Sequence, residues 1–557
     1  MSQRNRILVV GGVAGGASFA ARMRRLDESA EIVIYEKGPH VSFANCGLPY
    51  YTSGVIEKEE SLLVATPEKF RSWFGIDVRT MHEVTRIDKS ANTVVVRDHR
   101  TGDTFTDTYT HLVLSPGAEP IRPPLPGIDS PGIFTLRTVP DAVAVRRWVE
   151  ERQARRAVIV GGGYIGLEML ENLVHLGLHC TVIELADQVM APADKEMMTP
   201  IHEHLLDKGV DLRLGTKVTG FAEKEGVVTV STEGGGSAEG EMVVLSIGVR
   251  PLVKLAKDAD LELGPRGGIK VDAQMRTSDP SIFAVGDAVE VVDYVTGQPA
   301  LIPLAGPANR QGRIAADAIA GRDVAFRGTQ GTAVCGLFDY TIAMTGLTEK
   351  GALRAGVAFE KVYLNPGHHV GYYPGAQPIF LKMLFDPKDG RVLGAQAVGK
   401  AGVEKRVDVI STFIQMRATV FDLEEAELCY APQYGSAKDP VNMAGFIAAN
   451  HLRGDAPLVH FKDLVEGKAP ANVVVLDVRT QQEFDAGHID GAINIPLQEL
   501  RGRLAEVPRG RPVWTHCGVG IRSHNAVRIL RQAGVDALNL SGGWWQRNIA
   551  EKTFRKR

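Results

Sequence analysis

Two stretches of this chain repeat a pattern that few folds can accommodate: an apolar strand, a glycine-rich turn, a helix, and a second strand that ends in glutamate. They are residues 6–36 and 155–184. In a dinucleotide-binding unit, the turn and the N-terminus of the helix hold a pyrophosphate, while the acidic residue accepts ribose hydroxyls. Each stretch therefore predicts a parallel α/β domain with a dinucleotide at the turn.

The first turn, VVGGVAGGASF, departs from the G-x-G-x-x-G pattern at one position. Gly11 and Gly16 fit its outer positions, but the middle position is Val13. A glycine-rich turn without a ligand therefore stays open for this stretch taken alone. The residues that we expect to contact a cofactor here are Gly11, Gly15, Gly16, Glu36 and Lys37.

The second turn, VIVGGGYIGLE, matches the pattern in full through Gly161, Gly163 and Gly166. Glu184 ends its second strand, and no arginine follows directly in IELADQVM. A carboxylate at this place accepts ribose hydroxyls and repels a 2′-phosphate. The sequence therefore predicts that this domain binds NADH rather than NADPH.

Two nucleotide folds in one chain indicate FAD together with a nicotinamide. The stretch TSDPSIFAVGDAVE resembles the second flavin motif of flavoprotein reductases with two dinucleotide folds, which implies that Asp287 meets the ribitol. LVLSPGAEP (112–120) and VVLSIGVRP (243–251) resemble the crossing strands of that family and contain Gly117 and Gly248. The resemblance covers roughly residues 1–325.

One cysteine, Cys46 in SFANCGLPYY, follows the first nucleotide unit. Where a disulfide reductase commonly has a second cysteine, this chain has Tyr50 or Tyr51. We expect Cys46 at a helix start, which stabilises a thiolate; an inert core cysteine is the alternative. Its flanks resemble the single-cysteine branch of these reductases, which contains coenzyme A-disulfide reductases, NADH oxidases, NADH peroxidases and persulfide reductases.

Further residues discriminate within that branch. Ala14 occupies the place of a histidine that assists peroxide chemistry in the oxidases and peroxidases. GHHVGYYPGAQPI and ELCYAPQYGSAKDPVNMAG resemble segments that bring two tyrosines of the partner subunit to the active cysteine. This resemblance implies a homodimer, with Tyr372 and Tyr430 in those roles and Tyr373 and Tyr434 as weaker candidates.

The second sulfur can then come from outside the chain. The resemblance implies that coenzyme A forms a mixed disulfide with Cys46, and its phosphates need cations and donors. Arg25 and Ser42 are the first candidates by family position. The further candidates are Arg22, Asn45, Lys69 and Arg71.

The C-terminal part carries a second cysteine site. VVVLDVRTQQEFDAGHIDGAINIP, VWTHCGVGIRSHNAVRIL and LSGGWWQRN resemble the rhodanese sulfurtransferase domain. Backbone N–H groups of the loop from Cys517 to Arg522, together with the arginine charge, should hold a persulfide anion. A phosphatase is the rival interpretation, but four residues between cysteine and arginine suit sulfur better. A degenerate interaction domain is the other alternative.

Composition narrows the classes of partner. A formal net charge of −3 gives no case for nucleic acid, and five scattered cysteines do not form a disulfide framework. The sequence has no signal-peptide core and no run of 18 apolar residues, so we expect no membrane partner and a cytoplasmic location. Nothing in the sequence indicates a metal.

The expected fold class is α/β, with two Rossmann-like domains, an α+β dimerisation domain and a C-terminal rhodanese domain. The expected bounds are 1–120 with 252–325 for FAD, 121–251 for NADH, 326–450 for dimerisation, 451–470 for a linker and 471–557 for the rhodanese domain.

The whole chain resembles coenzyme A-disulfide reductase–rhodanese fusions, which include NADH-dependent persulfide reductases. This implies reduction of persulfide, polysulfide or coenzyme A-disulfide bonds at Cys46, with sulfur delivered by Cys517 through the linker. Two alternatives stay open. One is a flavin NADH oxidase with an accessory sulfur-binding module, and the other is a non-enzymatic redox or sulfur sensor.

Overall fold

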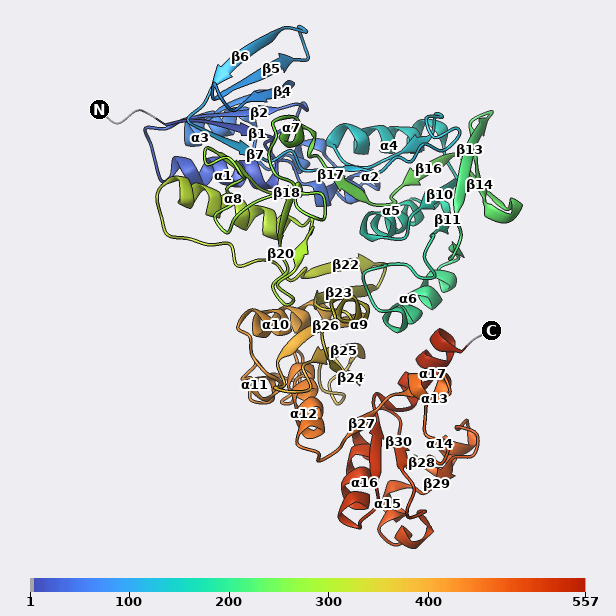
Figure 1. Ribbon diagram of the computed structural model, residues 1–557. Helices are drawn as coiled ribbons and strands as arrows, with labels where there is room; N and C mark the ends of the chain where they lie inside the picture. The colour runs from blue at the N-terminus through green and yellow to red at the C-terminus, as the bar shows by residue number, and fades with distance from the viewer. Residues whose placement is uncertain (1–4, 556–557) are drawn as a thin grey trace. The chain divides into compact units, whose positions relative to one another are not determined.

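A computed structural model describes residues 5–555 of the chain (Figure 1). The chain divides into two compact units. Unit 1 contains the residues up to Val189 together with Gly209–Gly331, and unit 2 contains Met190–Lys208 together with the residues from Thr332 onward. Each unit contains a parallel sheet, so the predicted α/β class is confirmed.

The first glycine turn belongs to a five-stranded parallel sheet of unit 1. The strands run in the order β19 (Ile282–Ala284), β7 (His111–Leu114), β1 (Arg6–Val10), β2 (Glu31–Glu36) and β3 (Asp77–Thr80). In β1 the residues RILVV are almost continuously apolar, as expected for a parallel strand that is covered on both faces. Helices α1 (Ala14–Arg24) and α8 (Ala305–Ile319) cover one face.

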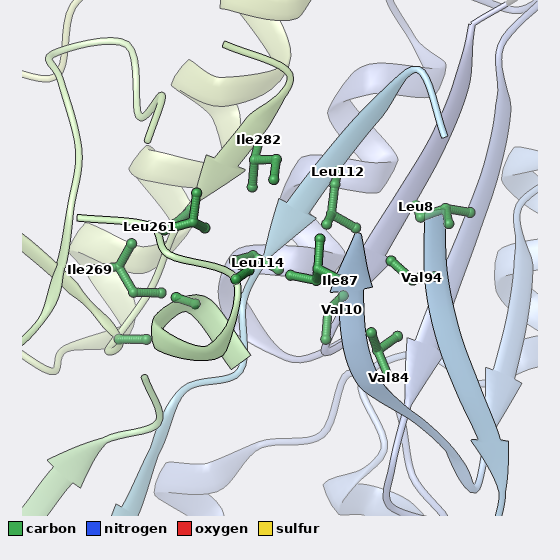
Figure 2. Close-up of a cluster of buried hydrophobic side chains, with 14 of the residues drawn as sticks. Leu8, Val10, Val84, Ile87, Val94, Leu112, Leu114, Leu261, Ile269 and Ile282 are labelled. Carbon is green, nitrogen blue, oxygen red and sulfur yellow. The ribbon is translucent and has the colours of Figure 1, made fainter. Parts of the chain in front are cut away.

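Alternate residues of β1 therefore pack into two different hydrophobic clusters, one on each face of the sheet. Ile7 and Val9 pack with the helices, whereas Leu8 and Val10 belong to the cluster in Figure 2. That cluster also contains side chains of β4 (His82–Asp88) and β5 (Thr93–Asp98), which belong to an antiparallel sheet in the order β4, β5, β6 (Thr104–Thr108). Packing on both faces therefore holds β1 in place, and the first glycine turn follows directly at its C-terminal end.

The second glycine turn belongs to another parallel sheet of unit 1. Its order is β12 (Asp211–Arg213), β11 (His179–Ile183), β10 (Arg156–Val160), β16 (Met242–Leu245) and β9 (Ile133–Phe134). Helix α5 (Tyr164–His175) follows the turn. Strands β8 (Ala118–Pro120) and β17 (Val249–Pro251) pair with each other, as expected for crossing strands.

The other elements of unit 1 are shorter or lie at its edges. They are η1 (Asn45–Gly47), α2 (Leu48–Thr52), η2 (Glu59–Leu62), α3 (Pro67–Phe74), α4 (Val139–Arg152), β13 (Val218–Lys224), β14 (Val227–Thr232), η3 (Glu233–Gly235), β15 (Ser237–Gly240), α7 (Lys254–Asp258), β18 (Ile269–Lys270), β20 (Val289–Val292) and β21 (Pro299–Ala300).

Unit 2 begins with an antiparallel sheet. Its order is β22 (Ala333–Leu337), β23 (Tyr340–Gly346), β26 (Val392–Gly399), β25 (Ile379–Phe385) and β24 (Glu360–Leu364). The accompanying helices are α9 (Glu349–Ala355), α10 (Val403–Gln415), α11 (Val420–Glu424) and α12 (Pro440–Leu452). Helix α6 (Lys195–Asp207) also belongs to unit 2, although the sequence grouped it with the NADH domain.

The C-terminal domain of unit 2 is a parallel sheet with helices. Its strands run in the order β27 (Leu458–Val459), β31 (Ala537–Leu540), β30 (Val513–His516), β28 (Val474–Asp477) and β29 (Ile493–Asn494). Its helices are α13 (Phe461–Val465), α14 (Gln481–Asp485), α15 (Leu497–Leu500), η4 (Leu504–Glu506), α16 (Ile521–Gln532) and α17 (Gly543–Phe554).

The segment 451–470, expected to be a linker, is structured. It contains β27, which pairs with β31, and α13, whose Phe461 is 1% exposed. Its proline, glycine and charged residues form the connections between these elements. The composition therefore indicated loops correctly but missed the short strand and helix between them.

A buried ion cluster joins α6 to the antiparallel sheet. The Lys382 ammonium is 0% exposed and lies 2.8 Å from Asp194, 2.6 Å from Glu196 and 2.7 Å from Glu349. Burial opposes the charge on Lys382, but these carboxylates raise its pKa well above the usual value. The three carboxylates alone have the spacing of a cation site, and the lysine nitrogen supplies the cation.

The C-terminal domain packs against the same sheet, close to this cluster. The backbone N–H of Tyr363 in β24 donates to Ser541 Oγ at 3.0 Å, and the Trp545 ring meets the Phe380 ring at 4.5 Å between centroids. Lys462 of α13 lies 3.5 Å from Glu349. The domain that carries Cys517 is therefore docked on the antiparallel sheet.

In the part of the chain that the structure describes, the longest helix is α8, with 15 residues. A membrane-spanning helix needs roughly 20 apolar residues. No described helix meets that requirement.

Candidate active sites

The first glycine turn has the compact geometry that a bound dinucleotide requires. A Cβ atom at Gly11 would collide with the Ser115 carbonyl oxygen, and one at Gly16 would collide with the Gly11 carbonyl oxygen. Glu36 Oε2 accepts a hydrogen bond from the Gly12 N–H at 3.0 Å. This places the acid beside the turn, where a ribose binds, so these residues fit the adenosine half of FAD.

The other residues expected around FAD lie at strand ends of unit 1. Gly15 opens α1, and Lys37 is exposed directly after β2. Gly117 and Gly248 flank the paired strands β8 and β17 and have φ angles of 75° and 118°, in the left-handed region that favours glycine. Asp287 follows β19, and burial raises its pKa while Arg137 lowers it.

The second turn repeats the arrangement around Glu184. Its carboxylate accepts hydrogen bonds from the N–H groups of Gly162 at 2.6 Å and Ala186 at 2.7 Å. Gly166 again meets the carbonyl oxygen of the first glycine, whereas no atom lies within 4 Å of a Cβ built on Gly163. Space at the middle glycine and a fixed acid both fit a dinucleotide.

Cys46 lies in η1 and is exposed. Helix α2 begins two residues later at Leu48 and is only five residues long. Although the residue as a whole is exposed, partial burial of its thiol, followed by the charges of Glu168 and Asp287, raises the Cys46 pKa above its usual value. Partial burial, with these two carboxyl groups adding to it, therefore outweighs the helix start that we expected to stabilise the thiolate.

Glu168 is a site residue that sequence reasoning missed. It lies in α5, and burial together with Glu171 raises its pKa to about 7. Helix α5 contacts the segment after Cys46, because Thr52 Oγ1 lies 3.9 Å from the Met169 sulfur. An acid amid the apolar residues of IGLEMLENL was the available signal.

Ser42 and Asn45 tie the Cys46 segment to its surroundings. Ser42 has a φ of 47°, an uncommon left-handed conformation for this residue, and its N–H donates to the Gly12 carbonyl at 2.8 Å. Asn45 Nδ2 donates to the Arg137 carbonyl at 3.4 Å. Ser42 therefore ties the thiol segment to the first glycine turn, and Asn45 ties it to the segment before α4.

The basic residues proposed to bind coenzyme A differ in whether other groups of the protein already bind their charged ends. Arg25 is exposed at the end of α1. Lys69 Nζ donates to a backbone carbonyl at 3.1 Å, and Arg71 is exposed and lies 3.9 Å from an aspartate. Arg22 is held by Asp317 at 2.7 Å. Arg25 is therefore the better placed of the two helix α1 candidates.

Tyr372 and Tyr430 form a pair at the surface of unit 2. Their hydroxyl oxygens are 2.7 Å apart, and the residues are 74% and 46% exposed. Two segments 58 positions apart thus present adjacent hydroxyl groups. The weaker candidates Tyr373 and Tyr434 are also exposed, but their hydroxyls do not belong to this pair.

The C-terminal cysteine lies at the base of a loop between β30 and α16. Cys517 is 1% exposed, and its sulfur accepts a hydrogen bond from the Gly520 N–H at 3.1 Å. Ser523 Oγ lies 3.6 Å from the same sulfur. The loop therefore provides donors at the N-terminus of α16, an arrangement that favours an anionic sulfur.

Two further contacts hold this loop. The Trp544 N–H in the closing segment donates to the Cys517 carbonyl at 2.6 Å. Arg522 donates to both carboxylate oxygens of Glu483 at 2.6 and 2.7 Å. Sequence reasoning predicted a role for Arg522 but missed its partner, because the two residues are 39 positions apart.

Comparison with known proteins places these sites in context. Residues 5–312 match the pyridine nucleotide-disulphide oxidoreductase family, 332–439 match its dimerisation domain, and 460–547 match the rhodanese-like domain. The coenzyme A disulfide reductase of Staphylococcus haemolyticus is 37% identical over 444 residues, which cover 80% of this chain and 99% of that protein.

Two solved structures align over nearly the whole chain. The reduced CoADR-RHD protein of Bacillus anthracis has a TM-score of 0.96 and 44% identity, and the alignment covers 99% of both chains. The NAD-dependent persulfide reductase of A. fulgidus has a TM-score of 0.88 and 37% identity, with 97% of this chain and 99% of that chain covered.

Proposed function

Because the chain belongs to the pyridine nucleotide-disulphide oxidoreductase family and ends in a rhodanese-like domain, we propose that it is an FAD-dependent reductase that uses NADH to cleave sulfur–sulfur bonds. Persulfides, polysulfides and coenzyme A disulfide are the proposed substrates. The similarity to a coenzyme A disulfide reductase and to an NAD-dependent persulfide reductase supports this choice. NADH as the reductant suits a cytoplasmic enzyme.

The exposed thiol of Cys46 is the observation that carries the proposal. Cys180 is the other cysteine of unit 1, and it is buried. Both cysteines of unit 1 are free, so Cys46 forms no disulfide within that unit. A small thiol such as coenzyme A supplies the second sulfur as a mixed disulfide.

The chemistry then needs only this one protein thiol. FAD held at the first glycine turn by Gly11, Gly16 and Glu36 would supply two electrons that originate from NADH. With these electrons and one proton, the Cys46–coenzyme A disulfide would separate into the Cys46 thiolate and the free thiol. The thiolate attacks the inner sulfur of coenzyme A persulfide, so hydrosulfide leaves with the electron pair and the mixed disulfide forms again. Asn45 and Ser42 hold the Cys46 segment in place during both steps.

The paired tyrosines complete the proposed site across a homodimer. The match to the dimerisation domain supports the assembly. The hydrogen bond between Tyr430 and Tyr372 raises the Tyr372 pKa, which favours the protonated hydroxyl of Tyr372. We assign them to the partner's substrate, where a hydroxyl can donate to the departing thiolate.

Exposed groups on α1 and α3 make the proposed contact with the phosphates of coenzyme A. Arg25 and Arg71 are the exposed cations, and Lys69 precedes Arg71 by two positions on α3. Arg22 contributes less because Asp317 already neutralises it.

The test is a set of NADH oxidation assays on the holoenzyme with coenzyme A persulfide, coenzyme A disulfide, polysulfide and air as acceptors. Cys46→Ser should retain FAD and accept hydride from NADH but lose turnover with the three sulfur acceptors. Cys180→Ala is the matched control and should keep that turnover. Fast oxygen-dependent turnover with slow sulfur reduction would establish the oxidase alternative. FAD binding without turnover on any acceptor would establish the sensor.

A further inference from the structure

The arginines connected to the Cys517 loop are paired with carboxylates. Arg522 belongs to the loop, and Arg479 and Arg547 lie over the ring of Trp544, whose backbone N–H donates to the Cys517 carbonyl. The pairs are Arg479–Asp477 at 2.6 Å, Arg522–Glu483 at 2.6 Å and Arg547–Glu551 at 3.5 Å. A sulfur donor that approaches Cys517 therefore meets arginines that already have carboxylate partners.

The Arg522–Glu483 pair is the one that borders the thiol. Arg522 interacts electrostatically with both Glu483 and Cys517, and Glu483 is the first cause of its raised pKa. The same contact lowers the Glu483 pKa to about 2, so this carboxylate is ionised throughout the neutral range. Thr480 fixes Glu483 further, because the two residues form the capping box of α14.

The rim of the loop is apolar. Val519 and Ile521 are 45% and 60% exposed, whereas Cys517 below them is 1% exposed. A donor must therefore bring its sulfur past two hydrocarbon side chains and a neutralised guanidinium. Weakly hydrated sulfane sulfur crosses such a rim at lower cost than a strongly hydrated dianion does.

We propose that Glu483 is a specificity-determining residue that selects thiol persulfides over dianionic donors such as thiosulfate at Cys517. This inference rests on the proposed function. The Cys517 thiolate attacks the outer sulfur of R–S–SH, a new sulfur–sulfur bond forms at Cys517, and the bond to the carrier breaks. The carrier thiolate leaves with the electron pair, so the transfer involves no net oxidation or reduction.

The selection follows from charge. Thiosulfate has two negative charges and a persulfide has at most one at its sulfur end, so the Glu483 carboxylate repels thiosulfate about twice as strongly at the same distance. Without that carboxylate, the free charge of Arg522 attracts thiosulfate more strongly for the same reason.

The experiment compares sulfur transfer to cyanide in the full-length holoenzyme from two donors, thiosulfate and 2-mercaptoethanol persulfide. Glu483→Gln keeps the size of the side chain and its ability to cap α14. We expect it to raise kcat/KM for thiosulfate about tenfold relative to the persulfide at low ionic strength, with a smaller gain at high salt. Glu483→Asp, which retains the charge, should keep the wild-type preference.

Glu506→Gln is the matched control, because Glu506 belongs to η4 and forms an exposed pair with Arg503 rather than with an arginine of the loop. It should leave the ratio of the two donors unchanged. An unchanged ratio in Glu483→Gln, with active sulfur transfer, would overturn the inference and leave the reductase proposal intact. If neither donor supports transfer by the wild-type protein, the sulfur-carrier role of Cys517 and this inference both fail.

Discussion

Replacement of Lys382 by methionine removes the cation on which three buried carboxylates converge. Methionine fills a similar volume, so the loss of charge dominates the effect. Removing one partner of a buried ion pair costs about 3–5 kcal/mol. Each carboxylate keeps at least one side-chain donor in the variant: Gln396 for Asp194 at 2.6 Å, the Tyr363 hydroxyl for Glu196 at 2.7 Å, and Lys361 for Glu349 at 2.8 Å. We therefore expect the free energy of unfolding to fall by the lower end of this range, about 3 kcal/mol.

The pH dependence of this loss identifies its cause. In the wild type the pKa values of Asp194 and Glu349 are lowered, so their contribution to stability is complete above the unfolded pKa near 4 and is lost only as the pH falls below it. Without Lys382, burial raises the pKa of these carboxyls instead. The variant should therefore be destabilised most at pH 8 and least at pH 5.5.

Urea unfolding of the FAD-bound protein, followed by circular dichroism, measures the change. The midpoint should fall by about 1 M at pH 8. Lys388→Met is the matched control, because Lys388 is exposed in the turn after the same strand and its loss should change the free energy of unfolding by less than about 0.5 kcal/mol. Equal losses for the two variants, or a loss that does not depend on pH, would refute the reasoning.

Three further predictions concern the active sites. Because Glu184 repels a 2′-phosphate, kcat/KM should favour NADH over NADPH by roughly 1–3 kcal/mol, and equal use of the two cofactors would contradict this. Glu168→Gln removes a charge that disfavours the Cys46 thiolate, so the rate of Cys46 alkylation in the holoenzyme should reach half its maximum at a lower pH. Mass spectrometry of the Cys46 peptide measures this rate, and an unchanged pH dependence of alkylation would exclude the electrostatic effect of Glu168 on Cys46. Cys517→Ser should abolish sulfur transfer to cyanide and slow turnover on polysulfide, but it should spare the reduction of coenzyme A persulfide. If the rates of sulfur transfer to cyanide and of polysulfide turnover are both unaltered, the C-terminal domain has a binding or regulatory role instead.

Local patterns predicted the parts of the fold whose residues lie close together in the sequence. The glycines at 161, 163 and 166 act within one turn, and Glu184 reaches that turn because β10 and β11 are adjacent parallel strands. The Cys517 loop is similarly local, since its cysteine, its donor at Gly520 and its arginine lie within six residues. The chemistry of these motifs can therefore be predicted from the sequence alone.

Pairs from distant segments were not predictable in the same way. Glu483 and Glu168 were missed because their significance depends on α14 facing α16 and on α5 lying beside the Cys46 segment. In the sequence, Lys382 is only a charged residue within an apolar strand. Its importance depends on carboxylates from α6 and α9, which contact it only in the folded structure. Arg22 resembled a free phosphate ligand because Asp317 lies 295 positions away.

The docking of the C-terminal domain changes how sulfur can leave Cys517. The sequence suggested a loop delivered on a linker, but β27 and α13 are part of the folded domain, and Trp545 and Ser541 contact the antiparallel sheet. Movement of the loop would have to break those contacts, whereas a small thiol needs only to enter the rim, take the sulfur and diffuse away. Coenzyme A suits this task because its thiol ends a long, narrow arm. Within the proposed function, one thiol can therefore collect sulfane sulfur at Cys517 and present it as a persulfide to Cys46.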